Sequence, residues 1–318
     1  MPFSLPELEQ AARIVYQAMP PTPQYCWPLL CQRLGTEVWV KHENHTPVGA
    51  FKIRGGLVYF QRLRQRQPGV AGVIAATRGN HGQSVGYAAR RAGLVATIVV
   101  PHGNSNEKNA AMRALGVELI EHGEDFQAAA EYAEQLAASR GLHMVPSFHE
   151  DLVQGVASYT LEFLRGAPAL DVVYVPIGLG SGICAMIAAR DALGLATRIV
   201  GVVSAHAPAY ALSFAHRRAV SHPVDTRLAD GVACRTPAPE ALEIIWAGAE
   251  RIVQVSDEEV AQAMRALYTD THNVAEGAGA IAFAAALGER QRLAGQRVGV
   301  VITGGNVDRQ IFARVLQD

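Results

Sequence analysis

The stretch KHENHTPVGAFKIRGG, residues 41–56, places a lysine in unusual surroundings. Lys52 follows Phe51 and lies among small or apolar residues, with Arg54 and two glycines after it. A lysine in apolar surroundings loses part of its preference for the charged form, and a neutral amine can form a Schiff base with an aldehyde. Alternatively, Lys52 and Arg54 form an ordinary charged face on the first turn of a helix. This stretch alone leaves both interpretations open.

A second polar stretch, TRGNHGQ, occupies residues 77–83, after an apolar run and before a helical pattern. Free backbone N–H groups at the start of a helix, together with the helix dipole, bind anions such as a carboxylate. The side-chain amide of Asn80 can hydrogen-bond a phenolic oxygen. The alternative is an Asn-Gly turn with a satisfied histidine.

A glycine-rich stretch, GLGSG, occupies residues 178–182 between another apolar run and a helical pattern. Glycines let successive N–H groups point at a phosphate, and a helix start adds a favourable field. A dinucleotide fingerprint needs a third glycine and an acid at the end of the next strand, where this chain has Ile183 and Ser204. We therefore expect a phosphate site here and no dinucleotide site, with a structural turn as the alternative.

Together these stretches resemble the motifs of the threonine dehydratase and serine racemase family, whose members bind pyridoxal phosphate (PLP) and have fold type II. The resemblance covers nearly the whole chain. Its lysine motif, with the Schiff-base lysine after Phe, is matched in order by Lys41, Glu43, Pro47, Ala50, Phe51, Lys52, Arg54 and Gly55. Ala50 stands where the family commonly has Ser.

The resemblance implies a role for residues in each motif. The family's Ser-Ser-Gly-Asn-His-Gly loop binds the substrate carboxylate, its tetraglycine loop binds the cofactor phosphate, and a late Ser or Thr faces the pyridine nitrogen. Two shorter matches, LADGV at 228–232 and EGAGA at 276–280, support the alignment. The expected cofactor-binding residues are Phe51, Lys52, Asn80, Gly178, Leu179, Gly180, Ser181, Gly182, Gly231, Glu276 and Thr303. The expected substrate-binding residues are Thr77, Arg78, Gly79, Asn80 and His81, and the catalytic residue is Lys52.

Two positions bear on the reaction. Arg78 stands where racemases of the family have a serine that serves as the second acid or base, and an arginine stays protonated at any working pH. Elimination needs only Lys52, and we hypothesise that Arg78 contacts the substrate or its loop. The neutral hydroxyl of Thr303 beside the ring nitrogen suits β-elimination better than transamination.

We expect no metal at the cation site that some family members have. Depending on the alignment, its two carboxylate positions hold Val203 and Ala209 or Ser204 and Tyr210, and none of these offers carboxylate oxygen. The four cysteines are scattered without a C-x-x-C pair, which favours free thiols in a reducing compartment.

Composition limits the partners. Hydrophobic residues make up 49% and charged residues 18% of 318 residues, with a formal net charge of -1. Such a chain is globular, and it lacks the basic patch that nucleic acid requires. We find neither a signal peptide nor an eighteen-residue apolar run, so we expect a cytoplasmic protein with no membrane or nucleic-acid partner. The expected partner is a small amino-acid substrate, and the resemblance suggests a homodimer or homotetramer.

Apolar strand patterns alternate with helical patterns that end at glycines, which indicates βαβ units in parallel sheets. We predict an α/β, two-domain fold type II PLP enzyme (tryptophan synthase β-like), with parallel-rich open sheets flanked by helices. Residues 1–68 and 149–318 would form the larger PLP-binding domain, and residues 69–148 the smaller α/β domain. We also expect a hairpin-like pair around Leu29 and residues 37–41, and a capping box from Ser256 to Glu259.

The sequence thus predicts a PLP-dependent ammonia-lyase that converts a β-hydroxy-α-amino acid, L-threonine or L-serine, into a 2-oxo acid and ammonia. Alternatives within the enzyme class are a dehydratase for phenylserine or 3-hydroxyaspartate and an amino-acid racemase. A non-catalytic PLP-binding protein would lose the lysine, so Lys52 argues against that class.

Overall fold

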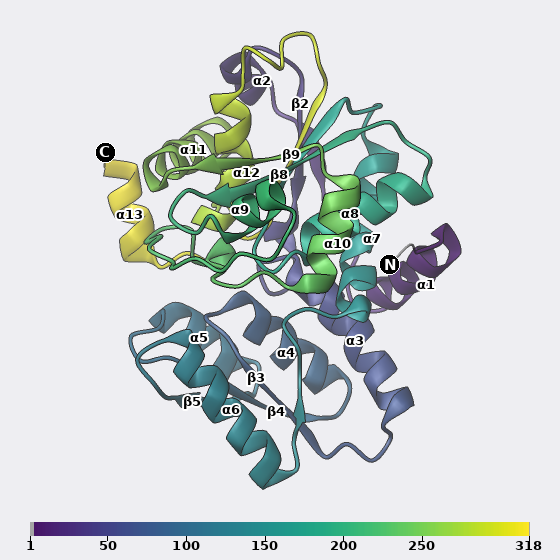
Figure 1. Cartoon of the computed structure of the whole chain (residues 1–318), viewed down its shortest axis with the longest axis vertical. Helices are drawn as coiled ribbons and strands as arrows, with labels where there is room; N and C mark the ends of the chain where they lie inside the picture. Colours follow the sequence, from purple (N-terminus) through teal and green to yellow (C-terminus); the bar gives the residue numbers. More distant parts are fainter. Residues whose placement is uncertain (1–2, 318) are drawn as a thin grey trace.

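The computed structural model describes residues 3–317, which form two sheets in separate parts of the molecule (Figure 1). The larger sheet has the strand order β1-β2-β10-β7-β8-β9. Its strands are β1 (Gln24–Cys26), β2 (Val38–His42), β7 (Val172–Pro176), β8 (Arg198–Ser204), β9 (Arg251–Val255) and β10 (Val298–Ile302). Only β1 pairs antiparallel to its neighbour, and the other pairs are parallel.

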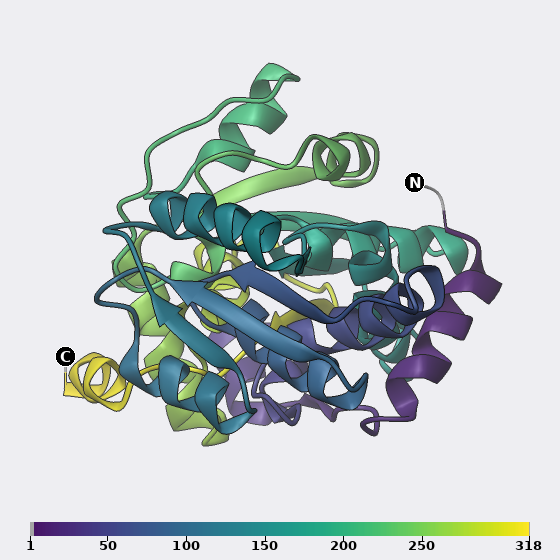
Figure 2. The ribbon, with the colours of Figure 1, turned by 90° about the horizontal axis from the view of Figure 1, so that it is seen from below.

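The smaller sheet is parallel throughout and has the order β5-β4-β3-β6. Its strands are β3 (Gly72–Ala76), β4 (Val95–Val100), β5 (Glu118–Glu121) and β6 (His143–Met144). All five residues of β3 are buried because helices cover both faces of the sheet, which explains its continuous apolar run. Figure 2 shows α6 (Phe126–Arg140) on one face, with α4 (Asn80–Arg91) and α5 (Asn106–Ala114) on the other.

The remaining helices surround the larger sheet and connect the two parts. They are α1 (Leu5–Tyr16), α2 (Pro28–Leu34), α3 (Lys52–Arg66), α7 (Glu150–Gly166), α8 (Ser181–Ala192), α9 (Ala209–His216), α10 (Pro239–Gly248), α11 (Asp257–Thr271), α12 (Gly277–Gly288) and α13 (Arg309–Gln317), with short 3-10 turns η1 (Glu43–His45) and η2 (Asp230–Val232). Within residues 3–317, no helix combines the length and the apolar character needed to cross a membrane.

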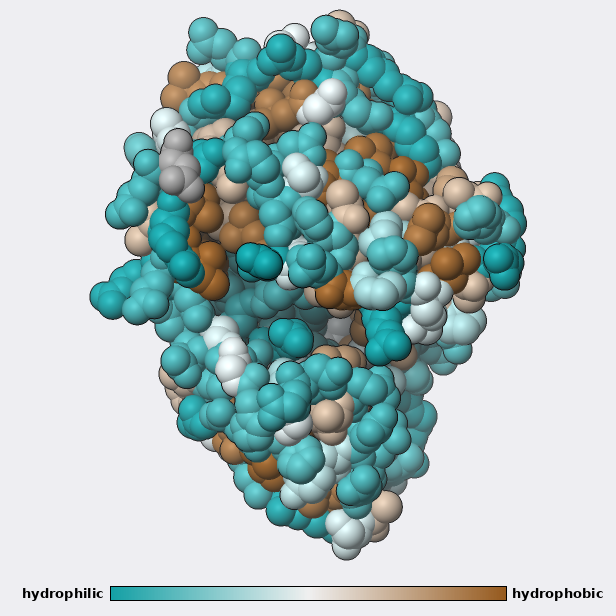
Figure 3. Space-filling model, turned by 60° about the vertical axis from the view of Figure 1, so that its left-hand side comes forward, coloured by the Kyte–Doolittle hydropathy of each residue, from teal (hydrophilic) through white to brown (hydrophobic). Residues whose placement is uncertain are grey.

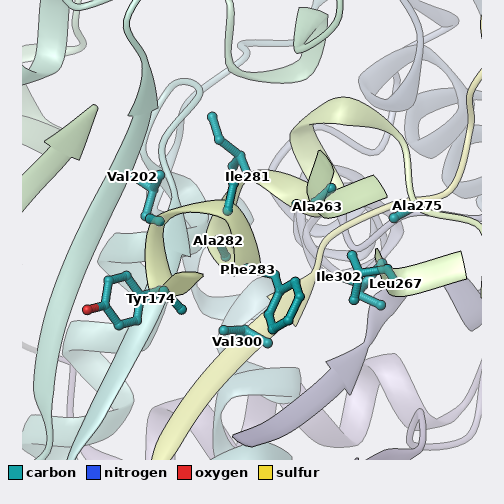
Figure 4. Packing of buried hydrophobic residues seen from close by; sticks show 14 of the residues in the cluster. Tyr174, Val202, Ala263, Leu267, Ala275, Ile281, Ala282, Phe283, Val300 and Ile302 are labelled. Carbon is teal, nitrogen blue, oxygen red and sulfur yellow. The ribbon is translucent and has the colours of Figure 1, made fainter. Parts of the chain in front are cut away.

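Helix α12 forms the centre of the core beside the larger sheet. Figure 4 shows Phe283 of α12 beside Val300 and Ile302 of β10, with Leu267 of α11 close by. Most of α12 is glycine or alanine, and all its residues from 277 to 286 are buried. These small side chains let the helix lie close to both the sheet and α11.

Helices α3 and α7 cross with their backbones in contact. An added Cβ on Gly155 of α7 would lie 2.3 Å from the carbonyl oxygen of Arg54 and 2.8 Å from Cα of Gly55, both in α3. The two backbones therefore touch, and α3 begins at Lys52. This crossing connects the packing of α7 to the position of the lysine.

The structure confirms the parallel-rich α/β fold, while the domain boundaries at 68/69 and 148/149 stay predictions. The capping box from Ser256 to Glu259 is confirmed. The strand expected around Leu29 is wrong, because Leu29 lies in α2, whose first residue is Pro28. A proline suits the first position of a helix, and residues 24–26 pair with β2 instead. The sequence also missed α10 and β9.

Candidate active site

Lys52 lies at the carboxyl end of β10. It is the first residue of α3, and the N–H of Phe51 donates to the carbonyl of Thr303 at 3.0 Å. Ala50 pairs with Gly304 through an isolated bridge. These backbone contacts hold the start of α3 against the loop after β10.

The amine of Lys52 is partly buried and lies 4.8 Å from the ring centroid of Phe51. Burial lowers the pKa of Lys52, and the charge of Glu276 partly opposes the shift. Within residues 3–317, Lys52 Nζ has no hydrogen bond or ion pair, so a larger share of this amine is neutral than in a solvated lysine.

The chain has only three lysines, Lys41, Lys52 and Lys108. Lys41 Nζ lies 2.6 Å from Glu162 Oε2, and Lys108 Nζ lies 2.7 Å from Asp230 Oδ2. Among the described residues, Lys52 is therefore the one lysine without a carboxylate at salt-bridge distance. This singles it out as the nucleophilic amine.

Asn80 joins the two parts of the molecule. It is the first residue of α4, and its Nδ2 donates to Oε1 of Glu276 at 2.5 Å. Its Oδ1 accepts from Nδ2 of Asn306 at 2.9 Å, and Asn306 also donates to the carbonyl of Val48. Asn80 thus lies between the end of the smaller sheet and the loops of the larger one.

Lys108 crosses the same boundary from α5. Besides its 2.7 Å contact with Asp230 in η2, its Nζ lies 3.5 Å from Oε2 of Glu276. Burial would lower the pKa of Lys108, but the two carboxylates outweigh it and raise the pKa above its usual value. An added Cβ on Gly79 would lie 2.5 Å from Cδ of Lys108. The aliphatic part of the lysine therefore packs against the loop of residues 77–81, which the sequence predicts to bind substrate.

The other residues of that loop differ in exposure. Thr77 is buried and its hydroxyl accepts from the N–H of Gly79 at 3.0 Å. His81 is half-buried, and burial, with a smaller effect of the Lys52 charge, lowers its pKa to about 3. Arg78 is exposed, and its side chain makes no hydrogen bond or ion pair with the described residues. The predicted contact of Arg78 with the loop is therefore not seen, and a contact with substrate stays a prediction.

The glycine loop joins β7 to α8 as the sequence predicts. Gly180 is the residue before the helix, with φ +102°, a conformation that strongly favours glycine. Ser181 and Gly182 are the first two residues of α8, so their backbone N–H groups have no partner within the helix. Such a helix start can bind a phosphate.

Two contacts attach this loop to its surroundings. A Cβ on Gly178 would lie 2.6 Å from the carbonyl oxygen of Gly231, which places these two predicted cofactor residues side by side. The hydroxyl of Tyr210 donates to the carbonyl of Leu179 at 2.9 Å. Tyr210 thereby holds the loop from the side of α9.

The start of α12 lies against the loop after β10. The hydroxyl of the buried Thr303 donates to the carbonyl of Ala278 at 3.1 Å. A Cβ on Gly279 would lie 2.3 Å from the carbonyl oxygen of Gly304. This close approach places Glu276, the residue just before α12, beside the same loop as Lys52.

Figure 3 shows a hollow on this face of the molecule, between its upper and lower parts and bordered mainly by hydrophilic residues. The structure connects residues that the sequence motifs named separately, because Lys52, Thr303, Glu276 and Asn80 are linked by the contacts above. The sequence analysis gave no role to Lys108, Asp230 or Asn306, although Asp230 lies within the LADGV match. The scarcity of lysine was the one signal that could have pointed to Lys108.

These residues suit PLP. The cofactor needs an unpaired amine, a phosphate cradle and polar neighbours, and Lys52 and the glycine loop offer the first two. Six buried side-chain polar atoms have no hydrogen-bond partner among the described residues, and two of them, Nε2 of His81 and Oε2 of Glu276, belong to this site, as expected where a polar ligand binds. No group of three His, Cys, Asp or Glu side chains within residues 3–317 could hold a metal ion.

Comparison with known proteins gives the same assignment. The family described as pyridoxal-phosphate dependent enzyme matches residues 15–304. L-threonine ammonia-lyase of Thermotoga maritima is 31% identical over 315 residues, which are 99% of this chain and 78% of that protein. L-threo-3-hydroxyaspartate ammonia-lyase of Saccharomyces cerevisiae is 30% identical over 296 residues, 93% of this chain and 90% of that protein.

Among solved structures, the processed form of threonine deaminase isoform 2 from Solanum lycopersicum superposes with a TM-score of 0.90. It is 27% identical, and the match covers 99% of this chain and 94% of that one. Both the fold and the cofactor predicted from the sequence are thereby confirmed. The chain belongs to the pyridoxal-phosphate dependent enzymes, in their fold type II threonine and serine dehydratase group.

Proposed function

We propose that this enzyme catalyses α,β-elimination from a β-hydroxy-α-amino acid, L-threonine or L-serine, and so releases a 2-oxo acid and ammonia. The observation that carries the proposal is the amine of Lys52, which is half-buried, has a lowered pKa and has no ion pair among the described residues. An amine in this state can act both as a nucleophile and as a base.

Bound PLP supplies an aldehyde for a Schiff base with an amine and a ring that accepts electron density from the substrate's α-carbon. Lys52 would hold the cofactor through Nζ, and its amine, when not attached to the cofactor, would be placed to take a proton from the substrate's α-carbon. The N–H groups at the start of α4, from the loop of residues 77–81, bind the substrate carboxylate. With the α-proton, the substrate's β-hydroxyl would leave as water, and hydrolysis of the unsaturated product would give the 2-oxo acid and ammonia.

The residues proposed to hold the cofactor are those predicted from the motifs. The glycine loop and the start of α8 bind the phosphate, Asn80 donates to the phenolic oxygen, and Thr303 faces the ring nitrogen. Phe51, Gly231 and Glu276 complete the surroundings. These roles are supported by the contacts that connect Lys52, Asn80, Glu276 and Thr303.

We also propose that the protein works in the cytoplasm as a homodimer or homotetramer. Its four cysteines are all free thiols, which suits a reducing compartment. The oligomeric state is proposed from the family alone.

A second candidate substrate is an acidic one, such as 3-hydroxyaspartate. It is favoured by Arg78, an exposed cation in the loop proposed to bind substrate. The relative from Saccharomyces cerevisiae carries this substrate in its name. Racemisation is disfavoured because Arg78 cannot serve as the second base.

The test combines a spectrum with product detection. The purified protein should show a visible cofactor band, and L-threonine, L-serine and L-threo-3-hydroxyaspartate are then added separately while 2-oxo acids are measured. We expect 2-oxobutyrate from threonine, and no band and no product with Lys52→Ala. Arg113→Met, a change at an exposed ion pair of α5, is the matched control and should keep both.

Borohydride reduction offers a separate check, because it fixes a Schiff base as a stable secondary amine. Peptide mapping should find the cofactor on Lys52 and on neither of the other two lysines. Product from the acidic substrate alone would move the specificity to Arg78. A protein without the band, or with the cofactor on another lysine, would refute the role of Lys52.

A further inference from the structure

Lys108 lies in the site yet belongs to none of the motifs. Its side chain is 8% exposed and extends from α5, in the smaller part, to two carboxylates of the larger part. The chain uses arginine for nearly all its other cations, and the three lysines are half-buried or buried. Burying an ammonium costs free energy unless nearby carboxylates compensate its charge. The two carboxylates beside Lys108 therefore indicate what this lysine does.

The Glu276 carboxylate is the deeper of the two partners, with a side chain 3% exposed against 37% for Asp230. Oε1 accepts from Asn80, whereas Oε2 is buried and has no hydrogen-bond partner among the described residues. A proton on Oε2 would therefore find no acceptor there. The ammonium of Lys108, 3.5 Å from Oε2, instead favours the ionised carboxylate.

An ionised carboxylate determines how the amide of Asn80 lies. A carboxylate only accepts hydrogen bonds, so Nδ2 of Asn80 must face Glu276 and Oδ1 must face Asn306, as observed. One N–H of Asn80 is used in this way, and the second makes no hydrogen bond within residues 3–317, so it is available to a ligand. A protonated Glu276 could also donate a hydrogen bond, and the side-chain amide of Asn80 could then face it with either its oxygen or its nitrogen.

We propose that Lys108 is a positioning residue of the active site: its ammonium favours the carboxylate form of Glu276, and this carboxylate fixes the Asn80 amide with one N–H left for the phenolic oxygen of the cofactor. This inference rests on the cofactor site described under the proposed function. It requires cofactor binding but no particular substrate.

The groups that face Glu276 come from four elements. Burial is the largest effect and leaves the pKa of Glu276 above its usual value; the charge of Lys108 on α5 and the Asn80 amide on α4 oppose this rise, and the charge of Asp230 in η2 adds to it. Lys52 on α3 faces it as a further cation. Removing Lys108 therefore moves the pKa of Glu276 upward, whereas removing the charge of Asp230 moves it downward.

The test follows the cofactor without turnover. The visible absorbance of the holoenzyme is titrated between about pH 5 and 9, and the Kd for PLP is measured by fluorescence. The acidic spectral midpoint is the pH at which the absorbance change on the acidic side is half complete. In Lys108→Met, this midpoint should rise by about one pH unit or more, as expected for the loss of a neighbouring charge. The Kd should rise about tenfold, because a hydrogen bond to a charged oxygen is lost. Lys108→Arg should restore most of both.

Two controls distinguish an effect of Lys108 on Glu276 from a merely structural contact between the two parts of the molecule. Asp230→Asn removes the charge of the contact across the boundary but leaves Lys108 beside Glu276, so its midpoint should stay at or below that of the wild type. Arg113→Met removes a cation from the same helix and should leave the midpoint unchanged. An unchanged midpoint in Lys108→Met, or an equal rise in Asp230→Asn, would overturn the proposal.

If Lys108→Met does not fold, Glu276→Gln tests the same link from the other partner. It should abolish the acidic transition and raise the Kd for PLP about tenfold, because the amide no longer fixes Asn80. Wild-type binding and titration in this variant would also overturn the proposal. Loss of elimination activity in an enzyme that still titrates as expected would instead count against the proposed substrates.

Discussion

Arg54 and Glu43 form a salt bridge of 2.7 Å in which both side chains are fully excluded from solvent. Arg54 also pairs with Glu162, which in turn accepts from Lys41. The four charges balance, and Arg54 lies two residues after Lys52 in the same helix turn. The cluster therefore anchors the part of α3 that carries the amine.

Replacing Arg54 by Met should lower the free energy of unfolding by roughly 3–5 kcal/mol, because two buried carboxylates lose their shared cation. Urea unfolding at neutral pH measures the change. The control is Arg113→Met, whose ion pair with Glu121 is exposed and should cost less than about 1 kcal/mol. Equal costs for the two variants would show that the buried cluster does not hold α3.

Gly155 tests the contact between α7 and α3. In Gly155→Ala the new methyl meets backbone atoms of Arg54 and Gly55, which cannot rotate away, so we expect a loss of about 1–3 kcal/mol in unfolding free energy. Because the displaced helix carries Lys52, affinity for PLP should fall as well. Gly288→Ala in α12 is the matched control, since nothing lies within 4 Å of its Cβ. It should keep wild-type stability or gain slightly, and equal losses in both variants would contradict the contact.

His42 predicts how stability depends on pH. Burial, with smaller effects of nearby charges, lowers the pKa of His42 from 6.5 to about 4. The unfolded chain binds the proton first, so the stabilisation is complete above about pH 6.5 and is lost as the pH falls toward 4. At pH 5 the loss relative to pH 7.5 is about 2 kcal/mol from this residue.

Urea unfolding at pH 7.5 and pH 5 checks this value. His42→Gln, which can still accept from the indole N–H of Trp27, should lose about 2 kcal/mol less than the wild type over this range. His216→Gln changes an exposed histidine and should follow the wild type. If His42→Gln lost as much unfolding free energy between pH 7.5 and pH 5 as the wild type, groups other than His42 would cause the acid sensitivity.

Arg78 is predicted to favour substrates that carry a second carboxylate. Arg78→Ser removes an exposed cation from the loop proposed to bind substrate, so kcat/KM for L-threo-3-hydroxyaspartate should fall about tenfold or more. The value for L-threonine should change far less, because threonine has no second carboxylate. Steady-state kinetics of both substrates, with Arg113→Ser as control, make the comparison. A parallel change for both substrates would remove Arg78 from specificity.

The sequence by itself determined the features that depend on neighbouring residues. The glycine before α8, the capping box of α11 and the loop between β3 and α4 are set by local backbone preferences, so their motifs predict them correctly. The alternation of apolar and helical segments likewise predicted the parallel sheets, since buried parallel strands require continuous apolar runs.

Tertiary structure decided which distant side chains meet. The apolar residues around Leu29 suit a strand as well as a helix, and two effects together favour the helix: Pro28 at its first position and the burial of Leu30 and Leu34 in the core. Lys108 and Glu276 are 168 positions apart in the printed sequence and belong to different parts of the molecule. No local pattern records their contact, because it depends on how α5 and α12 are brought together when the two sheets pack. The motifs therefore located the reactive lysine, and only the folded chain showed which charges surround it.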